Sequence, residues 1–322
     1  MTLSDIKKTA VIGAGLIGSA WATAFSRAGY KVNLYDINPQ TLTSGLDNIR
    51  CNLELFANSG VMDKSQIEDA LARITLCDNL EDALKDVQFI QESVPDKIEL
   101  KKDIIKKIDE YNTAAILSTS ASWLKLSDIA ADSPYANRCV GGHPFNPPHL
   151  MPLVEITHWE KTDPNLVQTA YEFYLSVGKV PIILQKETLG FIANRLQAAY
   201  VREAIALVKE GICSVEDVDM ASVYGLGVRY AILGPYLNSE MNAPGGVGDF
   251  FGAAYGAGFS AGFKRLAECS ITSVPEDLPQ LATEGVEIQK AKRPKETGNT
   301  RDEIIAHRDK LLIEILKLHN KL

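Results

Sequence analysis

One histidine and one glutamate form a pair that could move a proton. His143 lies in the stretch Gly141–Ile156, which three prolines stiffen, and Glu155 follows twelve residues later. Proline fixes φ and cannot donate to a strand ladder, so the stretch predicts a rigid turn between two short strands, with the two side chains adjacent. A carboxylate beside an imidazole fixes its tautomer and stabilises the imidazolium, as a general base requires. The spacing fits equally well a structural histidine beside a half-buried glutamate.

A glycine-rich motif near the N-terminus predicts a dinucleotide site. The apolar run Thr9–Ile12 leads into Gly13-Ala-Gly15-Leu16-Ile17-Gly18, and apolar positions then recur at helical spacing as far as residue 27. A second predicted strand, over 30–35, ends on Asp36. This order is the dinucleotide-binding fingerprint, in which the loop and the helix N-terminus meet the pyrophosphate. The alternative is a glycine turn without a ligand.

Asp36 indicates which dinucleotide fits. A carboxylate at this position bonds ribose hydroxyls and repels a 2′-phosphate, and no arginine follows it in Ile37–Thr41. NAD is therefore the expected cofactor. We expect no metal site.

Hydroxyl side chains gather where a later predicted strand ends. The run Ala114–Thr119 is apolar at first, and hydroxyls then occupy Ser118, Thr119, Ser120 and Ser122. Open parallel sheets bind ligands at the carboxyl ends of their strands, so one of these serines could contact a substrate. A serine there could equally cap the following helix, and the pattern leaves both interpretations open.

Strand patterns stop near residue 186 and helical patterns follow. Further strands are expected at 74–77, 88–94, 138–142, 153–156 and 179–184, and helices at 39–73 with a break near residue 60, 98–108 and 165–177. The lysines at 101, 102, 106 and 107 are expected to form mostly a solvated face. We therefore predict an α/β fold, with a doubly wound, Rossmann-type, mostly parallel sheet in residues 1–186.

Residues 187–322 are predicted to form an all-helical domain that binds substrate and dimerises. Helices are expected over 187–211, after a capping box at Ser214, and over 300–322. The glycine-rich run 245–262 is expected to form loops, and the polar run 271–300 to have little order. Apolar faces at Ala198–Val208 and in the terminal helix (Leu311, Leu312, Ile315 and Leu316) favour a two-fold homodimer. Alternatively, the terminal helix folds back on the first domain.

Composition excludes several classes of partner. The 322 residues carry a formal net charge of −8 without a dense basic stripe, which disfavours nucleic acid and acidic membrane surfaces. No apolar run approaches the roughly 18 residues of a membrane span, and the polar N-terminus does not resemble a signal peptide. The five scattered cysteines indicate reduced thiols and a soluble, cytoplasmic protein; they are Cys51, Cys77, Cys139, Cys213 and Cys269.

Taken together, the motifs resemble the 3-hydroxyacyl-CoA dehydrogenase superfamily over nearly the whole chain. They are the glycine motif, Gln91–Asp96, Ser118–Ser122, His143–Pro147 and Gly190–Arg195, in matching order and spacing. Within the superfamily, Gly225–Pro235 and the helical tail look most like the L-gulonate 3-dehydrogenase branch, which includes the lambda-crystallins. The L-carnitine dehydrogenases are near relatives.

The resemblance implies a role for each matching residue. His143 would be the catalytic base, with Glu155 orienting it. Ser122 and Asn194 would bond the substrate oxygen. The residues implied to contact NAD are Gly13, Gly15, Gly18 and Asp36, together with Asp96 and Lys101. Relatives generally have glutamate in place of Asp96, which makes that contact less secure. The resemblance also suggests a homodimer.

The implied reaction is NAD-dependent oxidation of the 3-hydroxyl of a small hydroxy acid. Arg229 is our candidate for binding the substrate carboxylate, because its fork matches that anion; a structural interface arginine is the alternative. An acyl-CoA would require a basic surface, but residues 39–73 hold three basic and five acidic side chains. A small free acid is therefore favoured, and the resemblance suggests an L-gulonate-type substrate. L-carnitine would need a cation site, which Trp123 and Tyr230 leave open. A purely structural, crystallin-like role is a further alternative.

Overall fold

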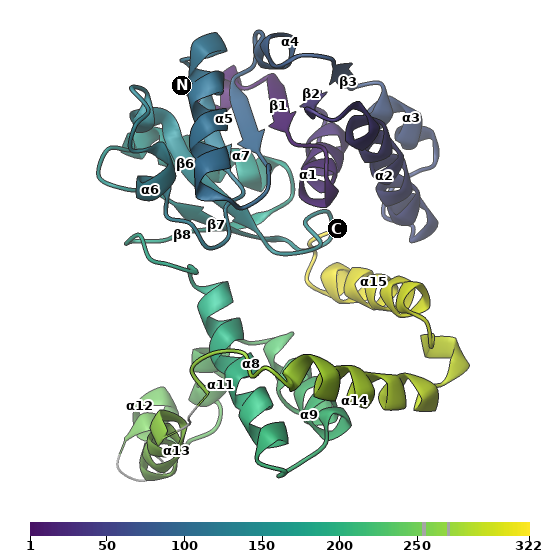
Figure 1. Cartoon of the computed structure of the whole chain (residues 1–322), viewed down its shortest axis with the longest axis vertical. Coiled ribbons are helices and arrows are strands. Elements are labelled where there is room, and N and C mark those ends of the chain that lie inside the picture. Colours follow the sequence, from purple (N-terminus) through teal and green to yellow (C-terminus); the bar gives the residue numbers. More distant parts are fainter. Residues whose placement is uncertain (253–255, 269–270) are drawn as a thin grey trace. The chain divides into compact units, whose positions relative to one another are not determined.

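The computed structural model describes residues 1–252, 256–268 and 271–322. The chain divides into two units, and each is described by itself. The first comprises Met1–Asn194 together with Leu312–Leu322, and the second comprises Arg195–Leu311. Both chain termini therefore belong to the first unit, which contains the sheet (Figure 1). Four cysteines are free thiols, and Cys269 lies outside the described residues; the four are Cys51, Cys77, Cys139 and Cys213.

The described strands form one sheet of the predicted doubly wound type. In chain order they are β1 (Lys8–Ile12), β2 (Lys31–Tyr35), β3 (Ile74–Cys77), β4 (Phe89–Glu92), β5 (Ile116–Thr119), β6 (Cys139–Pro144), β7 (Leu153–Thr157) and β8 (Val180–Ile183). Their order across the sheet is β3-β2-β1-β4-β5-β6-β7-β8. The first six pair in parallel, β7 is antiparallel to β6, and β8 is parallel to β7. The strand order reverses between β1 and β4, where ligands of such sheets bind.

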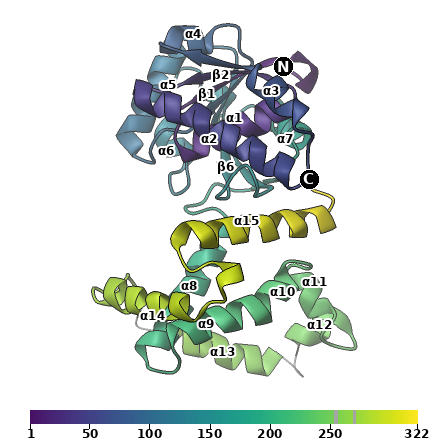
Figure 2. The ribbon, with the colours of Figure 1, turned by 90° about the vertical axis from the view of Figure 1, so that its right-hand side faces the viewer.

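Helices cover both faces of the sheet (Figures 1 and 2). On one face lie α1 (Leu16–Arg27), α2 (Pro39–Asn58), α3 (Ser65–Leu71) and α7 (Pro164–Ser176). On the other lie α4 (Leu80–Leu84), α5 (Ile98–Tyr111) and α6 (Leu126–Ala130). Within β1, Val11 packs into the first layer, whereas Ala10 and Ile12 pack into the second. Successive strand residues point to opposite faces, so a strand buried on both sides is continuously apolar.

The second unit is helical, as predicted for this part of the chain. Its elements are α8 (Ala193–Lys209), α9 (Val215–Ala221), the π-helical η3 (Ser222–Gly227), α10 (Val228–Tyr230), α11 (Pro235–Glu240), α12 (Gly246–Phe251), α13 (Gly256–Glu268), α14 (Leu278–Lys292) and α15 (Arg301–Leu318). The start of α8, up to Asn194, and the last part of α15, from Leu312, belong to the first unit. Short 3-10 helices are η1 (Leu3–Asp5), η2 (Ala136–Arg138) and η4 (Lys295–Thr297). The predicted capping box at Ser214 opens α9.

The helix predicted to begin at residue 187 begins only at Ala193. The carboxylate of Glu187 accepts a hydrogen bond from Ser127 N–H (N···O 2.8 Å), so this residue caps α6 instead. The chain then turns through positive φ at Gly190 (71°) and Phe191 (50°). A Cβ on Gly190 would lie 2.5 Å from the ring of Trp123. The close packing of Trp123 on this turn therefore also requires a residue without a side chain.

Two segments predicted as loops or weakly ordered contain helices. The glycine-rich run contains α12 and α13, and the polar run contains α14. Glycine disfavours helix by about 1 kcal/mol, yet the carboxylate of Glu240 caps the start of α12 by accepting from Val247 N–H (N···O 2.6 Å). In α14 a proline occupies the first turn, where it has no N–H to lose, and Lys292 pairs with Glu216 of α9.

The last turns of α15 pack on the first unit. Ile313 and Leu316 are buried, and Ile313 contributes to a cluster with Phe56 and Leu150. The ammonium of Lys317 donates to Ser59 O, at the end of α2 (N···O 2.7 Å). The terminal helix therefore folds back on the sheet-containing unit from Leu312 onward, so part of its apolar face is covered within one chain.

A buried lysine fixes the connection between β6 and β7, which includes a cis Asn146–Pro147 peptide bond. The side chain of Lys179 donates to Pro148 O and to Met151 O (3.3 Å to the latter). Burial, reinforced by the nearby charge of Arg27, lowers the pKa of Lys179 to about 7. A neutral amine still has two hydrogens, which is enough for both carbonyls.

This lysine predicts a pH dependence of stability. In the unfolded chain its pKa returns to roughly 10.4, so between about pH 7 and 10 the unfolded state holds a proton that the folded state lacks. The free energy of unfolding should therefore rise with pH across this window through Lys179, and Lys179→Met should remove that rise. Urea unfolding at several pH values measures it, with Lys102→Met as the surface control. Parallel curves for wild type and Lys179→Met would contradict the prediction.

Candidate active site

The register of β6 and β7 brings His143 and Glu155 together. The two residues are directly paired in the antiparallel ladder. Nδ1 of His143 lies 2.8 Å from Oε2 of Glu155, and both side chains are buried, at 5% and 0% exposure. Residues opposite each other in a ladder project from the same face, so two strands and one stiff turn suffice to form the pair.

The second oxygen of Glu155 is bound by the N-terminus of a helix. Oε1 accepts from Ile192 N–H (2.8 Å) and from Ala193 N–H (3.0 Å), where α8 begins. Burial would raise the pKa of Glu155, but the hydrogen bond from His143 and those from the two backbone amides outweigh it and lower the pKa. An ionised carboxylate only accepts, so Nδ1 of His143 carries the hydrogen and Nε2 presents its lone pair.

A second bonded pair joins Ser122 to Asn194, 72 residues later. Nδ2 of Asn194 donates to Oγ of Ser122 (2.8 Å) and to its backbone carbonyl (3.2 Å). Asn194 directly follows Ala193, whose amide bonds Glu155. The start of α8 thus holds both pairs in one constellation. The serine and the asparagine named from the sequence come together here.

Phe191 is a neighbour that the sequence did not point to. Its ring centroid lies 5.2 Å from that of the His143 imidazole, and the side chain is buried at 2% exposure. Its φ of 50° is uncommon for a residue other than glycine. Only Gly190, directly before it, hinted at a turn in the sequence. The turn aims the first amides of α8 at Glu155.

The glycine loop has the shape that a dinucleotide requires. Gly13 has a φ of 98°, and a Cβ there would lie 2.8 Å from Ser93 O of the loop after β4. A Cβ on Gly18 would lie 1.7 Å from Gly13 O, so this glycine permits close packing of α1. A Cβ on Gly15 would meet nothing within 4 Å, which leaves open space at the helix N-terminus for a pyrophosphate. Leu16, 75% exposed, follows, and Ile17 packs on the core.

Asp36 is oriented by the glycine loop. Its Oδ2 accepts from Ala14 N–H (2.8 Å) and its Oδ1 from Asn38 N–H (2.9 Å). Each oxygen keeps a lone pair, which suits the ribose hydroxyls of NAD. Ile37, 83% exposed, follows it, and no basic side chain occurs before α2 begins at Pro39. The residues present therefore fit NAD.

Asp96 and Lys101 have partners within the protein. Lys101 is 1% exposed, and its ammonium donates to both oxygens of Glu92 (2.9 Å each) and to Val94 O (3.2 Å). It does not lie on a solvated face, because this buried carboxylate draws it inward. Oδ2 of Asp96 accepts from the backbone amides of Ser122 and Trp123. Contact of either side chain with NAD stays a prediction.

Arg229 lies on α10 of the second unit, directly after the π-helical η3. Its Nε donates to Oδ1 of Asn238 (3.2 Å), which orients the guanidinium from one edge. A π-helical stretch is rare and often lies at functional sites. The carboxylate-binding role of Arg229 stays a prediction.

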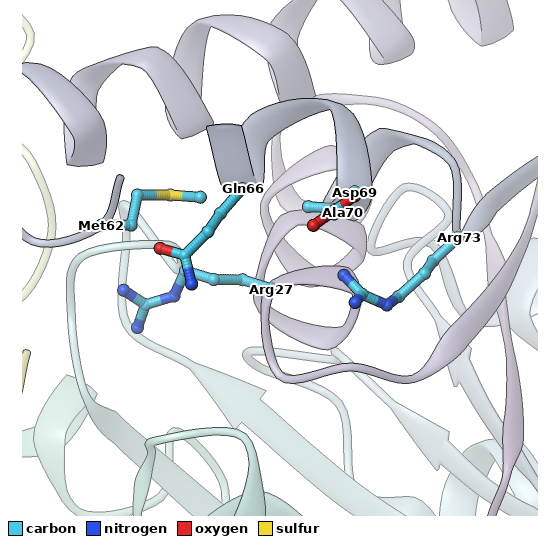
Figure 3. A pocket seen from close by; sticks show the side chains of 6 residues that line it. All are labelled: Arg27, Met62, Gln66, Asp69, Ala70 and Arg73. Atoms are coloured by element: carbon cyan, nitrogen blue, oxygen red, sulfur yellow. The ribbon is translucent and has the colours of Figure 1, made fainter. Parts of the chain in front are cut away.

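A pocket of about 100 Å³ lies at the end of α1 remote from the glycine loop (Figure 3). It is lined by Arg27, Met62, Gln66, Asp69, Ala70 and Arg73. Arg73 donates to Ser26 O (3.3 Å), and the guanidinium of Arg27 lies 4.4 Å from the ring centroid of Phe56. Both cations thus have contacts within the protein. None of the predicted site residues lines this pocket.

Within the described residues, the structure offers neither a membrane-spanning helix nor a metal site. None of the helices placed by the structure is long and apolar enough to cross a membrane. In the same part of the chain, no three histidine, cysteine, aspartate or glutamate side chains are grouped so that they could hold a metal ion.

Comparison with known proteins identifies a family for both parts of the chain. Residues 8–188 match the model of the 3-hydroxyacyl-CoA dehydrogenase NAD binding domain, and residues 190–272 match the C-terminal domain of the same family. The human lambda-crystallin homolog is 39% identical over 237 residues, 73% of this chain and 74% of its own. L-carnitine dehydrogenase of Streptomyces coelicolor is 31% identical over 99% of this chain and 96% of its own.

A solved structure extends the similarity to the whole fold. The NAD⁺-dependent enzyme 5-formyl-3-hydroxy-2-methylpyridine 4-carboxylic acid 5-dehydrogenase superposes with a TM-score of 0.77 at 25% identity, over 98% of this chain and 97% of that one. The fold, the glycine loop with Asp36 and the two family-model matches agree with one another. The chain therefore belongs to the 3-hydroxyacyl-CoA dehydrogenase family and is an NAD-dependent dehydrogenase.

Proposed function

We propose that this dehydrogenase oxidises the 3-hydroxyl of a small hydroxy acid to the 3-keto acid, with an L-gulonate-type substrate favoured. One observation carries the proposal: the pairs His143–Glu155 and Ser122–Asn194 are joined through the start of α8. They lie in the same unit as the glycine loop. This set provides a proton acceptor, His143, and a hydrogen-bond donor, the Ser122 hydroxyl, for one alcohol oxygen.

The first part of the mechanism is proton removal. Nε2 of His143 takes the hydroxyl proton, because Nδ1 is engaged with Glu155. The ionised Glu155 then stabilises the imidazolium, and burial of both groups strengthens that attraction. When bound, NAD accepts the hydride from the carbinol carbon. Phe191 beside the imidazole shields it from water.

The second part is stabilisation of the oxygen as it becomes a carbonyl. Because Asn194 donates to Oγ of Ser122, the serine hydroxyl is left to donate its own hydrogen to the substrate. A preorganised donor of this kind contributes roughly 3 kcal/mol in the transition state. Both amide hydrogens of Asn194 are used by the carbonyl and the Oγ of Ser122, so Asn194 acts on the substrate oxygen through this serine.

The charges around α2 and α3 favour a small free acid over an acyl-CoA. Arg50 is paired with Glu68 (2.7 Å), and Arg73 donates to Ser26 O. Outside that pair, the segment holds two basic residues, Lys64 and Arg73, against four acidic ones. Such a surface repels the phosphates of a coenzyme A thioester.

L-carnitine is the second candidate substrate. Similarity to an L-carnitine dehydrogenase extends over 99% of the chain. The ring of Trp123, next to Ser122, is 46% exposed and offers an aromatic face to a quaternary ammonium. A purely structural role, as the name lambda-crystallin suggests, would not require His143, Glu155, Ser122 and Asn194 to stay bonded as a set.

A substrate screen tests the proposal. Rates with NAD are measured for L-gulonate, L-carnitine, 3-hydroxybutyrate and 3-hydroxybutyryl-CoA. We expect the highest kcat/KM for L-gulonate, and we expect Arg229→Met to raise KM for the acid without weakening NAD binding. A preference for L-carnitine would select the second candidate. A preference for the thioester, or no oxidation of any of the four, would reject the proposed substrate class.

Substitution of the proposed base, His143, should lower the catalytic rate and leave NAD binding unchanged. We expect His143→Ala to lower kcat by at least about 100-fold, because loss of a general base costs roughly 10²–10⁴ in rate. NAD affinity, measured by fluorescence titration, should stay unchanged. His307→Ala, on α15, is the control. A loss of less than about tenfold would remove His143 from the mechanism.

Asp36 should control the choice of cofactor. We expect Asp36→Ala to weaken NAD binding and to narrow the preference for NAD over NADP, because the repulsion of a 2′-phosphate is lost. Dissociation constants for both dinucleotides measure this, with Asp47→Ala on α2 as a control of equal charge change. Equal use of NAD and NADP by the wild type would show that our interpretation of Asp36 is wrong.

We also propose that the active unit is a homodimer formed by the second unit. Its first long helix, α8, exposes Leu196 (62%), Tyr200 (44%) and Val201 (43%). A two-fold interface is the commonest way to cover such a face. Light scattering of the active enzyme should give twice the chain mass of 35.2 kDa. A fully active species of single-chain mass would exclude the dimer.

A further inference from the structure

Asp96 is bonded to the loop that carries Ser122. We propose that Asp96 is a positioning residue that fixes Ser122 through its backbone, rather than a side chain that holds NAD. The inference rests on the proposed function, in which the Ser122 hydroxyl donates to the substrate oxygen.

The first observation is that two backbone amides, of Ser122 and Trp123, donate to the same carboxylate oxygen of Asp96. Oδ2 of Asp96 accepts from Ser122 N–H (3.2 Å) and from Trp123 N–H (3.1 Å). Both amides belong to the connection between β5 and α6. Hydrogen bonds from backbone amides to a carboxylate are charge-assisted and stronger than neutral ones. Asp96 therefore orders the backbone at Ser122.

The second observation is that Ser122 is held from the other side as well. Nδ2 of Asn194 donates to the carbonyl and to Oγ of Ser122. The amide of Ser122 is thus held by Asp96, and its carbonyl and hydroxyl are held by Asn194. Loss of the first restraint lets the peptide unit rotate even while the second is intact.

The third observation is that Asp96 lies next to a buried polar network formed by Glu92 and Lys101. Glu92 is fully buried; its Oε1 accepts from Val94 N–H (2.7 Å) and its Oε2 from the Thr119 hydroxyl (2.5 Å). Lys101 bonds Glu92 and also Val94 O, and its ammonium lies 3.9 Å from Oδ1 of Asp96. Glu92 and Lys101 thus join the loop after β4 to the end of β5. Asp96 extends this connection to Ser122.

The geometry commits one of the two oxygens of Asp96 to the Ser122 loop. Two amides take both lone pairs of Oδ2, whereas Oδ1 lies 3.9 Å from the ammonium of Lys101, which donates to Glu92 and Val94 O. The side chain is 33% exposed, so Oδ1 is also reached by solvent. A cofactor role and a positioning role therefore predict different losses on substitution.

A double-mutant cycle separates the two roles. We expect Asp96→Ala to lower kcat/KM for the oxidised acid by roughly 10- to 100-fold, as expected when a substrate contact is misplaced. The dissociation constant of NAD should change by less than about 2-fold. In a Ser122→Ala background the same substitution should cost less than about 3-fold, because its target is already gone. Asp96→Asn, which keeps one acceptor oxygen, should lie between Asp96→Ala and wild type.

Hydrogen exchange provides a measurement that needs no substrate. In Asp96→Ala the peptide covering residues 119–125 should exchange about tenfold faster than in wild type, because two amides lose their acceptor. Asp103→Asn, an exposed carboxylate on α5, should leave that peptide unchanged. If NAD affinity falls at least tenfold, or if the two substitutions multiply independently, the positioning role is overturned. Unchanged exchange would also overturn it.

Failure of the proposed function is distinguishable from failure of this inference. If the wild type oxidises none of the four acids, the substrate class is rejected, while the exchange rates and NAD affinities still decide what Asp96 does. Faster exchange with unchanged NAD affinity supports positioning. Weaker NAD binding with unchanged exchange supports the cofactor contact and ends the inference.

Discussion

The site depends on one carboxylate with two different partners. One oxygen of Glu155 orients His143, and the other accepts from the amides of Ile192 and Ala193, where α8 begins. A buried carboxylate needs several donors to stay ionised, and these donors come from an imidazole and a helix N-terminus. The same bonds that orient His143, the proposed base, therefore also hold the start of α8, where Asn194 meets Ser122.

Carboxylates that bind backbone amides recur around the site. Asp36 bonds the glycine loop, Glu92 bonds the loop after β4, Asp96 bonds the loop at Ser122, and Glu187 bonds the start of α6. Loops leave backbone amides without ladder partners, and an acidic side chain satisfies them with charge-assisted bonds. Part of the acidic surplus of this chain is therefore structural.

The sequence predicted an element correctly where its local residue pattern favours the same secondary structure as its packing in the fold. The strands fell within two residues of their predicted bounds, because burial on both faces leaves a continuous apolar run. Prediction failed where distant groups override local preference. The glycines of α12 disfavour helix locally, but Glu240 caps it. The start of α8 moved to Ala193 because Glu187 bonds Ser127, 60 residues earlier in the chain.

The sequence by itself determined the chemistry available: a glycine loop ending in Asp36, and the order of Ser122, His143, Glu155 and Asn194. Residue types and short spacings carry that information, and one stiff turn already implied the His143–Glu155 pair. Only the tertiary structure decided which groups are engaged. Lys101 is buried on Glu92, Asp96 is bonded to the loop of Ser122, and the end of α15 lies on the first unit. Those outcomes depend on contacts between residues far apart in the chain, which no local pattern records.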